Sequence, residues 1–112
     1  MVHRVYKIVP ASLWVEAEAN GLFKGASIDL ADGFIHLSTR EQVAETARLY
    51  FRGQTDLLLV ELDGDALGER LVYEKSRNAA LFPHFYGEIP VAAVVSKYVM
   101  TVNERGEFVF PF

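Results

Sequence analysis

The sequence predicts a single α+β domain built on a largely antiparallel β-sheet, with two helices near the amino end. Its 112 residues are 51% apolar, which supplies material for one packed core. Helical periodicity occurs in two segments of the first half, and five or six strand-like segments fill most of the rest. Helices followed by a run of strands are typical of an α+β fold.

The amino end predicts a strand followed by a helix. Residues 2–9 (VHRVYKIV) alternate in polarity and are rich in β-branched side chains, and Pro10 ends them. Residues 11–20 (ASLWVEAEAN) read as a helix that Gly21 ends. Its inner face would carry Leu13, Trp14 and Ala17. We expect residues 21–33 to form a polar, glycine-containing connection.

Residues 33–39 (GFIHLST) predict a strand that contains a histidine. Successive side chains of a strand point to opposite faces, so Ile35 and Leu37 would share one face. The opposite face would carry Phe34, His36 and Ser38. The strand therefore has an apolar side for the core and a second side suited to line a cleft.

A second helix is expected over residues 40–51 (REQVAETARLYF), with Gly53 following its end. Apolar side chains recur at helical spacing at Val43, Ala47, Tyr50 and Phe51. Either of two pairs forms a capping box at its start, leaving the other hydroxyl free. The two pairs are Ser38 with Glu41 and Thr39 with Gln42.

The second half reads mainly as strands. Strand-like segments cover residues 55–63, 70–75, 93–102 and 106–112, and the NERG sequence at 103–106 predicts a hairpin between the last two. Residues 76–93 show little periodicity. Long irregular segments in a compact domain are often functional.

Composition excludes several classes of function. The absence of cysteine removes disulfides, thiol nucleophiles and thiolate metal sites. Eleven basic against fifteen acidic residues, with no basic run, disfavour nonspecific binding to nucleic acid or an anionic membrane. No segment holds the ~20 apolar residues of a membrane span, and the amino end lacks a signal-peptide core. We expect a cytoplasmic protein of undetermined oligomeric state.

Two histidine motifs are the main candidates for chemistry. His36 is either a ligand-facing residue or a buried histidine that donates one ring hydrogen bond. His84 lies in LFPHFYG, residues 81–87, among Phe82, Phe85 and Tyr86. These aromatic rings would either hold a flat ligand or seal the end of the sheet.

Glu74, in YEKSR, is a third candidate. If its strand neighbours that of His36, its carboxylate reaches the same cleft as a base or as a stabiliser of a developing cation. The alternative is an ion pair with Lys75 or Arg77. Arg77 beside such a cleft would suit a phosphate.

Other readings of these side chains are weaker. Arg4, Lys7 and Arg77 are ordinary candidates for the surface. His36, Glu74 and His84 lack the close spacing of a metal motif such as HExxH, so no metal site is predicted. The GxSxG elbow of serine hydrolases is absent from the sequence.

Taken together, GFIHLST, the following helix and strand, YE and FPHFYG resemble the family catalogued as domain of unknown function 952. The resemblance runs from VYKIVPASLW to about Val95. Members of that family resemble the ADP-ribosyltransferase fold, a split antiparallel β core that grips NAD in a cleft. The resemblance therefore implies a split sheet and NAD as a substrate.

In the ADP-ribosyltransferase fold, a His-Gly-Ser or His-Gly-Thr strand holds NAD. The resemblance assigns this triplet to His36, Leu37 and Ser38. It implies that the His36 side chain bonds a ribose hydroxyl, that the Leu37 backbone bonds the nicotinamide amide, and that the Ser38 hydroxyl helps to place the nicotinamide ribose. Leucine keeps the backbone donor and acceptor of glycine but takes more space. Nicotinamide would stack on Tyr86 or Phe85.

The first functional hypothesis is an NAD-using transferase or NAD-glycohydrolase. Glu74 or His84 would stabilise the oxocarbenium-like state as nicotinamide leaves. The second is a noncatalytic module that binds a nucleotide or another small metabolite in the same cleft, and Leu37 in place of glycine motivates it. Both require His36 to face a cleft that it shares with His84.

Overall fold

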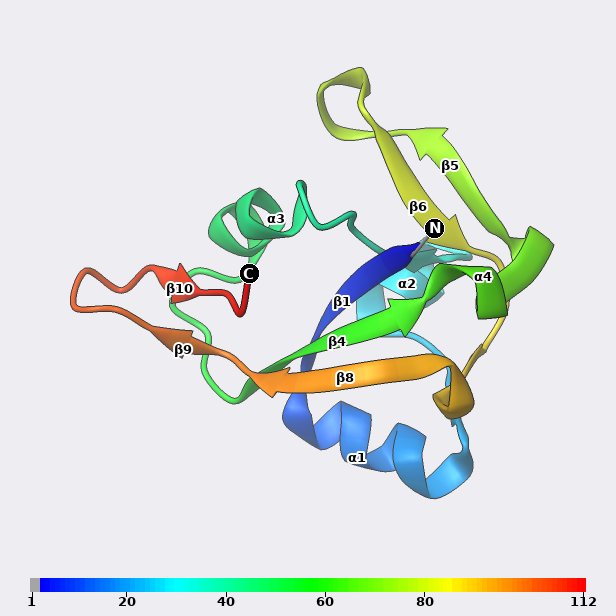
Figure 1. The fold of residues 1–112 in the computed structure, drawn as a ribbon, viewed down its shortest axis with the longest axis horizontal. Helices are drawn as coiled ribbons and strands as arrows, with labels where there is room; N and C mark the ends of the chain where they lie inside the picture. The colour runs from blue at the N-terminus through cyan, green and yellow to red at the C-terminus, as the bar shows by residue number, and fades with distance from the viewer. Residues whose placement is uncertain (1–2) are drawn as a thin grey trace.

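Two three-stranded antiparallel sheets form the centre of the molecule, which the computed structural model describes over residues 3–112 (Figure 1). The first sheet has the order β1 (Arg4–Pro10), β4 (Leu57–Asp63) and β8 (Val94–Val99). The second has the order β3 (Ile35–His36), β6 (Leu81–Phe85) and β5 (Leu71–Lys75). Every pairing between these strands is antiparallel.

Shorter elements surround these sheets. Two small antiparallel pairs join β2 (Leu22–Phe23) to β7 (Ile89–Pro90) and β9 (Thr101–Val102) to β10 (Phe108–Val109). The helices are α1 (Ala11–Asn20), α2 (Ser27–Asp32), α3 (Val43–Tyr50) and α4 (Gly64–Leu67). Short 3-10 turns occupy Gly68–Arg70, Arg77–Ala79 and Val91–Ala93. None of the helices within residues 3–112 is long and apolar enough to cross a membrane.

The segment after β3 connects the two main sheets. The Tyr6 amide donates to the Ser38 carbonyl at 2.8 Å, and the Ser38 amide donates to the Tyr6 carbonyl at 2.9 Å. One continuous stretch therefore pairs with β6 at residues 35–36 and with β1 at residue 38. The predicted α+β class with antiparallel sheets and amino-terminal helices is confirmed, and the ADP-ribosyltransferase-like arrangement stays a prediction.

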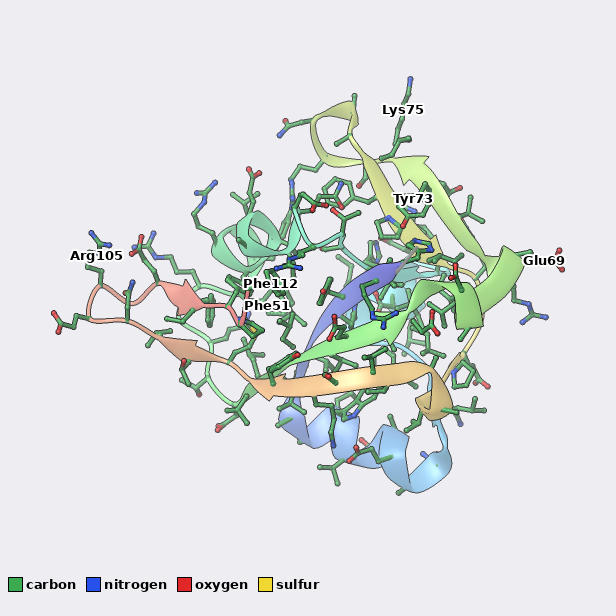
Figure 2. All side chains as sticks on the ribbon, viewed as in Figure 1. Phe51, Glu69, Tyr73, Lys75, Arg105 and Phe112 are labelled. Carbon is green, nitrogen blue, oxygen red and sulfur yellow. The ribbon has the colours of Figure 1, made fainter. Side chains whose placement is uncertain are left out.

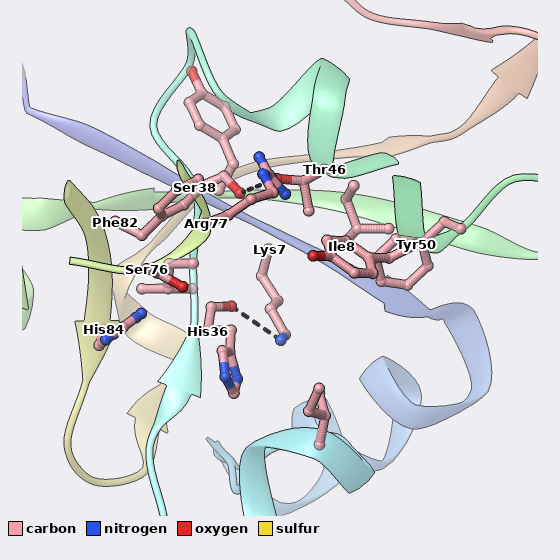
Figure 3. A pocket seen from close by; sticks show the side chains of 14 residues that line it. Lys7, Ile8, His36, Ser38, Thr46, Tyr50, Ser76, Arg77, Phe82 and His84 are labelled. Atoms are coloured by element: carbon pink, nitrogen blue, oxygen red, sulfur yellow. Dashed lines mark hydrogen bonds between the residues drawn. The ribbon is translucent and has the colours of Figure 1, made fainter. Parts of the chain in front are cut away.

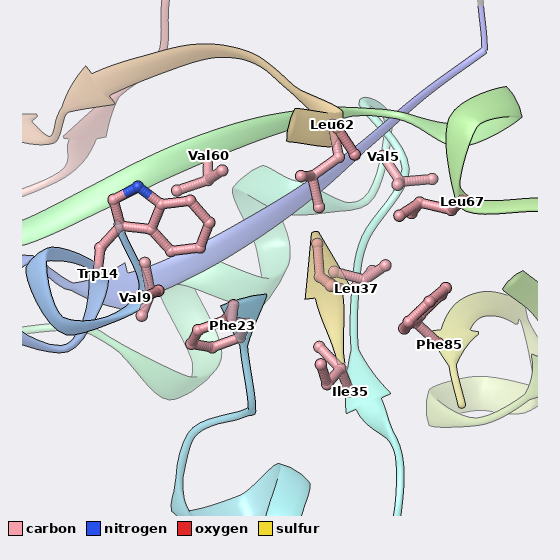
Figure 4. Packing of buried hydrophobic residues seen from close by; sticks show 13 residues of the cluster. Val5, Val9, Trp14, Phe23, Ile35, Leu37, Val60, Leu62, Leu67 and Phe85 are labelled. Carbon is pink, nitrogen blue, oxygen red and sulfur yellow. The ribbon is translucent and has the colours of Figure 1, made fainter. Parts of the chain in front are cut away.

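Two apolar clusters form the core. The larger lies between α1, the first sheet and β3, and contains Trp14, Phe23, Leu62 and Phe85 (Figure 4). It also buries the Ile35 and Leu37 side chains, which confirms the predicted apolar face of GFIHLST. The smaller cluster packs α3 on the other side of the first sheet through Tyr6, Ile8, Val43, Ala47, Leu57 and Leu59. Figure 2 shows Tyr73 and Lys75 extending from β5, and Arg105 from the β9–β10 turn.

Both predicted helices are present. α1 has the expected bounds and ends at Gly21 in a left-handed conformation, with φ of 80°. Its inner face buries Trp14 and Ala17. α3 begins three residues later than predicted, and its N-cap residue, Gln42, makes no side-chain cap bond. In the preceding turn the Thr39 amide donates to Gln42 Oε1 at 3.0 Å, which is one half of the second predicted capping box. The NERG hairpin is also confirmed, by the pairing of β9 with β10.

Two segments predicted to be irregular contain regular structure, and these predictions are wrong. Residues 21–33 form β2 and α2, and residues 76–93 include β6 and β7. Elements of two to six residues are too short to show periodicity in the sequence. β6 also contains Pro83, which normally argues against a central strand. The proline carbonyl accepts from the Leu37 amide, just beyond the two residue pairs of the β3–β6 ladder, so its missing N–H falls where that ladder ends.

Candidate functional site

A pocket of about 280 Å³ opens between β1, the β3 segment, α3 and the region around β6 (Figure 3). Five predicted site residues are in its lining: His36, Leu37, Ser38, Arg77 and His84. Among the described residues, no aspartate or glutamate lines it. The full lining is Tyr6, Lys7, Ile8, Ile28, His36, Leu37, Ser38, Thr46, Tyr50, Phe51, Ser76, Arg77, Phe82 and His84.

The two histidines are direct partners across β3 and β6. The Leu37 amide donates to the Pro83 carbonyl at 3.0 Å, so His36 and His84 form the non-hydrogen-bonded type of antiparallel pair. Side chains approach more closely in such pairs. The two ring centroids lie 5.6 Å apart, and Phe34 packs against both rings. The shared cleft that the sequence predicted for these histidines is present.

The short helix α2 surrounds the His36 ring with carboxylates. Nδ1 lies 2.7 Å from Asp29 Oδ1, and Nε2 lies 2.9 Å from Asp32 Oδ2. The backbone of His36 points away from β6, as its pairing type requires, and its amide donates to Asp29 Oδ1 at 3.0 Å. The ring is neither fully buried nor free, with 30% of the side chain exposed.

Lys7 neutralises Asp29 inside the protein. Its Nζ lies 3.0 Å and 3.1 Å from the two Asp29 oxygens and donates to the His36 carbonyl at 3.0 Å. Lys7 is 6% exposed and Asp29 is 2% exposed, so the expectation that Lys7 lies on the surface is wrong. Lys7 sits on a strand whose residues from Val5 to Val9 are all buried, and a buried ammonium requires a charged partner.

Burial and charge pairing act against each other in this pair. Burial lowers the pKa of Lys7, while the Asp29 carboxylate acts to raise it. For Asp29, burial acts to raise the pKa, but hydrogen bonds from His36 and Ala26 together with the Lys7 ammonium bring it to about 2. Asp29 is therefore ionised at neutral pH.

His84 has its own carboxylate. Nδ1 lies 2.8 Å from Glu74 Oε1, which also accepts from the Tyr86 hydroxyl at 2.6 Å. These two hydrogen bonds hold the pKa of Glu74 below its usual range, and the carboxylate in turn raises the pKa of Tyr86. β5 neighbours β6 and not β3, so Glu74 reaches the cleft through His84 and does not line it. Within residues 3–112 it forms no ion pair with Lys75 or Arg77.

Arg77 forms the opposite wall of the pocket. Its guanidinium carbon lies 4.7 Å from the Phe82 ring centroid and 5.6 Å from that of Tyr50. One of its nitrogens donates to Thr46 Oγ1 at 3.3 Å, and Thr46 Oγ1 lies 3.0 Å from Ser38 Oγ. Among the described residues, no carboxylate forms a salt bridge with this guanidinium. The arginine therefore brings an uncompensated positive charge to a wall that also carries hydroxyl groups.

Three residues that the resemblance assigned to NAD are placed differently from that expectation. Phe85 packs into the larger core cluster, so its ring is not on the pocket. Tyr86 is partly exposed beside Phe34 and is not among the lining residues. Leu37 is in the pocket lining, but its side chain is packed in the larger core cluster, and its amide already donates to the Pro83 carbonyl. The backbone donor that the resemblance reserved for nicotinamide is thus occupied.

Sequence reasoning missed the carboxylates of α2. Asp29 and Asp32 lie in the segment that was predicted to be a connection. A usable signal was present, because an aspartate in a first turn and a glycine just after the end are typical helix boundaries, and Gly33 adopts φ of 85°. Tyr50 and Thr46, both on α3, were likewise not identified as site residues. No group of three or more histidine and carboxylate side chains within residues 3–112 is arranged to hold a metal ion.

Comparison with known proteins agrees with this fold. A sequence model of a family described as "Protein of unknown function (DUF952)" matches residues 8–97. The crystal structure of CC0527 from Caulobacter crescentus superimposes with a TM-score of 0.91 at 42% identity, covering 96% of this chain and 94% of that one. The solution structure of CC0527 gives a TM-score of 0.83 at 43% identity, covering 93% and 90%. No curated protein matches the chain. The family match covers most of the sequence, and the chain belongs to the DUF952 family.

Proposed function

We propose that the pocket binds a nucleotide through its phosphate, with NAD as the first candidate ligand. The observation that carries the proposal is the charge of the lining. Four basic or titratable nitrogen side chains line the pocket, no carboxylate does so among the described residues, and yet the chain carries a net charge of -4. The four are Lys7, His36, Arg77 and His84.

Arg77 is the phosphate-binding group of this proposal. Lys7 is already paired with Asp29, which leaves the arginine as the cation without a carboxylate among the described residues. Its planar fork suits two phosphate oxygens, and the rings of Phe82 and Tyr50 restrict its orientation. Hydroxyl groups of Ser38, Thr46 and Ser76 line the same pocket and supply further donors.

The size of the pocket favours one nucleotide unit. About 280 Å³ lies at the lower limit for small-molecule sites. NAD would therefore enter with one of its two nucleotide halves, and the other half would extend along the surface. Ribose bonding by His36, which the family resemblance implies, requires the exposed Asp32 carboxylate to leave Nε2.

Calorimetric titration with NAD, AMP, nicotinamide mononucleotide and nicotinamide riboside tests this proposal. The first three carry phosphate and the last does not, so we expect binding by the phosphate-bearing compounds and a decrease as salt is raised. Arg77→Met should weaken their binding by about 10- to 150-fold, the value of one charged hydrogen bond. Arg48→Met, an exposed arginine on α3 that pairs with Glu45, is the matched control and should leave binding unchanged.

Absence of binding at millimolar concentrations of all four compounds would contradict the proposal. Equal affinity for nicotinamide riboside and its phosphate would also contradict it, because the phosphate would then contribute nothing.

Turnover of NAD, as a transferase or glycohydrolase, is the second candidate function. Its support is the contact between His84 and Glu74, because the family resemblance implies a polar group that stabilises an oxocarbenium-like state. Following nicotinamide release from NAD tests it directly. Glu74→Gln should slow the release while leaving binding by Arg77 intact, whereas binding without any release supports the noncatalytic module.

A further inference from the structure

The pocket is bordered by two carboxylate–histidine pairs on neighbouring strands. Asp29 contacts Nδ1 of His36 at 2.7 Å, and Glu74 contacts Nδ1 of His84 at 2.8 Å. A carboxylate at Nδ1 fixes the ring orientation and leaves Nε2 as the nitrogen available for proton transfer. Two such pairs facing one pocket are the arrangement that a general acid and a general base require.

The Nε2 atoms of the two rings have different surroundings. His36 Nε2 lies 2.9 Å from Asp32 Oδ2, while Nδ1 of the same ring contacts Asp29. His84 Nε2 has no hydrogen-bond partner among the described residues. It is also not a fully buried atom, since the one fully buried unpaired side-chain atom of this part of the chain is Trp14 Nε1. His84 Nε2 is therefore accessible to solvent, on a side chain that lines the pocket.

We propose that His36 and His84 act as the acid and the base in hydrolysis of a nucleoside 2′,3′-cyclic monophosphate. The inference rests on the proposed function, because Arg77 holds the phosphate. A water molecule attacks phosphorus and transfers a proton to Nε2 of His84. The bond from phosphorus to one ribose oxygen breaks, its electron pair remains on that oxygen, and Nε2 of His36 supplies the proton. The product is a nucleoside monophosphate.

Geometry and size select this substrate class. His36 and His84 lie directly opposite each other across β3 and β6 and line one pocket, and their ring centroids are 5.6 Å apart, so both rings lie close enough to contact one bound phosphate. The pocket volume of about 280 Å³ suits one nucleotide unit, and a cyclic phosphate keeps its leaving oxygen within that unit. The Asp32 side chain is 46% exposed and is not among the lining residues, and the proposed step requires the leaving oxygen to take its place at Nε2 of His36.

The charged neighbours of both rings determine the pH profile. His36 faces Asp29 and Asp32 from α2 and the buried Lys7 from β1. His84 faces Glu74 from β5 and Tyr86 from the residue after β6, and Arg77 also lines the pocket. An acid and a base acting together give a bell-shaped dependence of kcat/KM on pH.

The experiment incubates the purified full chain with 2′,3′-cyclic AMP and follows phosphorus NMR. We expect a monophosphate product, with kcat lowered about 10²- to 10⁴-fold in both His36→Gln and His84→Gln. The matched control is His3→Gln, since this third histidine contacts Tyr73 outside the pocket, and turnover should be unchanged. The acid limb should disappear in His84→Gln and the alkaline limb in His36→Gln.

Binding of the cyclic nucleotide without hydrolysis would overturn this inference and leave the proposed function intact. Failure to bind any phosphate compound would contradict the proposed function itself. Hydrolysis that persists in both His36→Gln and His84→Gln, or that is lost equally in His3→Gln, would also overturn the inference. Turnover of NAD without hydrolysis of the cyclic nucleotide would replace it with the second candidate function.

Discussion

The two carboxylate–histidine pairs of the pocket have nearly the same contact distance but opposite surroundings. Asp29 is 2% exposed and contacts Lys7, the His36 amide and the Ala26 amide as well as the His36 ring. The Glu74 side chain is 38% exposed, and among the described residues its hydrogen-bond partners are His84 and Tyr86. The carboxylate–histidine contact is therefore part of the core at His36 on β3 and lies at the surface at His84 on β6.

Dielectric environment explains why the two pairs are built differently. A buried carboxylate loses its hydration and must recover that free energy from a cation and several donors, and removing one partner leaves an uncompensated charge. A hydrated carboxylate needs no such compensation, and its ion pair contributes little to stability. Substitutions on the Asp29 side should therefore change stability, and substitutions on the Glu74 side should change local protonation.

The largest expected effect is that of Asp29→Ala. It leaves the Lys7 ammonium buried without its partner and frees two backbone amides from their acceptor. We expect a loss of about 3–5 kcal/mol in the free energy of unfolding, measured by urea denaturation at neutral pH. Asp32→Ala on the same helix is the matched control and should cost about 1 kcal/mol or less, because Asp32 is exposed. Equal losses for the two variants would remove the distinction between buried and exposed carboxylates.

Acid should reduce the stability that ionised Asp29 contributes to the fold. The pKa of Asp29 is about 2 in the folded protein and 3.8 ordinarily, so its contribution is complete above pH 4 and disappears as pH falls through about 2. The difference corresponds to about 2 kcal/mol. Urea denaturation between pH 2 and pH 6 checks it: the wild type should lose about 2 kcal/mol more than Asp29→Asn on acidification. Parallel pH dependence of the two proteins would show that Asp29 does not titrate differently on folding.

The same comparison explains what the sequence predicts and what it does not. Alternation along GFIHLST correctly predicts that Ile35 and Leu37 are buried and that His36 faces a cleft, because neighbours along one strand decide this. Asp29 pairs with Lys7 across 22 positions, and nothing local in either segment indicates the contact. Side-chain partners that depend on the packing of α2 against β1 are consequences of tertiary structure.

The placement of His84 shows a second limit. Three aromatic residues lie near His84 in LFPHFYG, and the sequence does not distinguish them. In the structure Phe85 faces the core, Phe82 lines the pocket and Tyr86 lies outside the pocket. Periodicity separates these positions only once the segment is known to be a strand. Pro83 made this strand hard to recognise from the sequence. Because β5 pairs with β6 and not with β3, Glu74 contacts His84 and does not contact His36.

A smaller effect is expected for Glu74→Gln. Glutamine keeps an oxygen acceptor at this exposed position, so the melting temperature should remain within about 2 °C of the wild-type value. Thermal unfolding followed by circular dichroism measures it. A shift as large as that of Asp29→Ala would mean that the Glu74 side of the pocket is as important to the fold as the Asp29 side.

The smallest expected change, and the one most specific to the Glu74 side, is in the titration of Tyr86. Its hydroxyl donates to Glu74, and that hydrogen bond, with burial and the carboxylate charge, raises the pKa of the phenol. Glu74→Gln removes the charge, so Tyr86 should ionise at lower pH in ultraviolet absorbance titrations, and Tyr86→Phe identifies which transition is lost. Tyr73 is the internal control, because burial raises its pKa and Glu74 is not among the causes. If the titration of Tyr86 does not respond to Glu74→Gln, the Glu74 carboxylate does not bond the Tyr86 hydroxyl and contacts His84 alone. The Asp29 and Glu74 sides of the pocket would then differ in burial but not in the hydrogen bonding of their exposed groups.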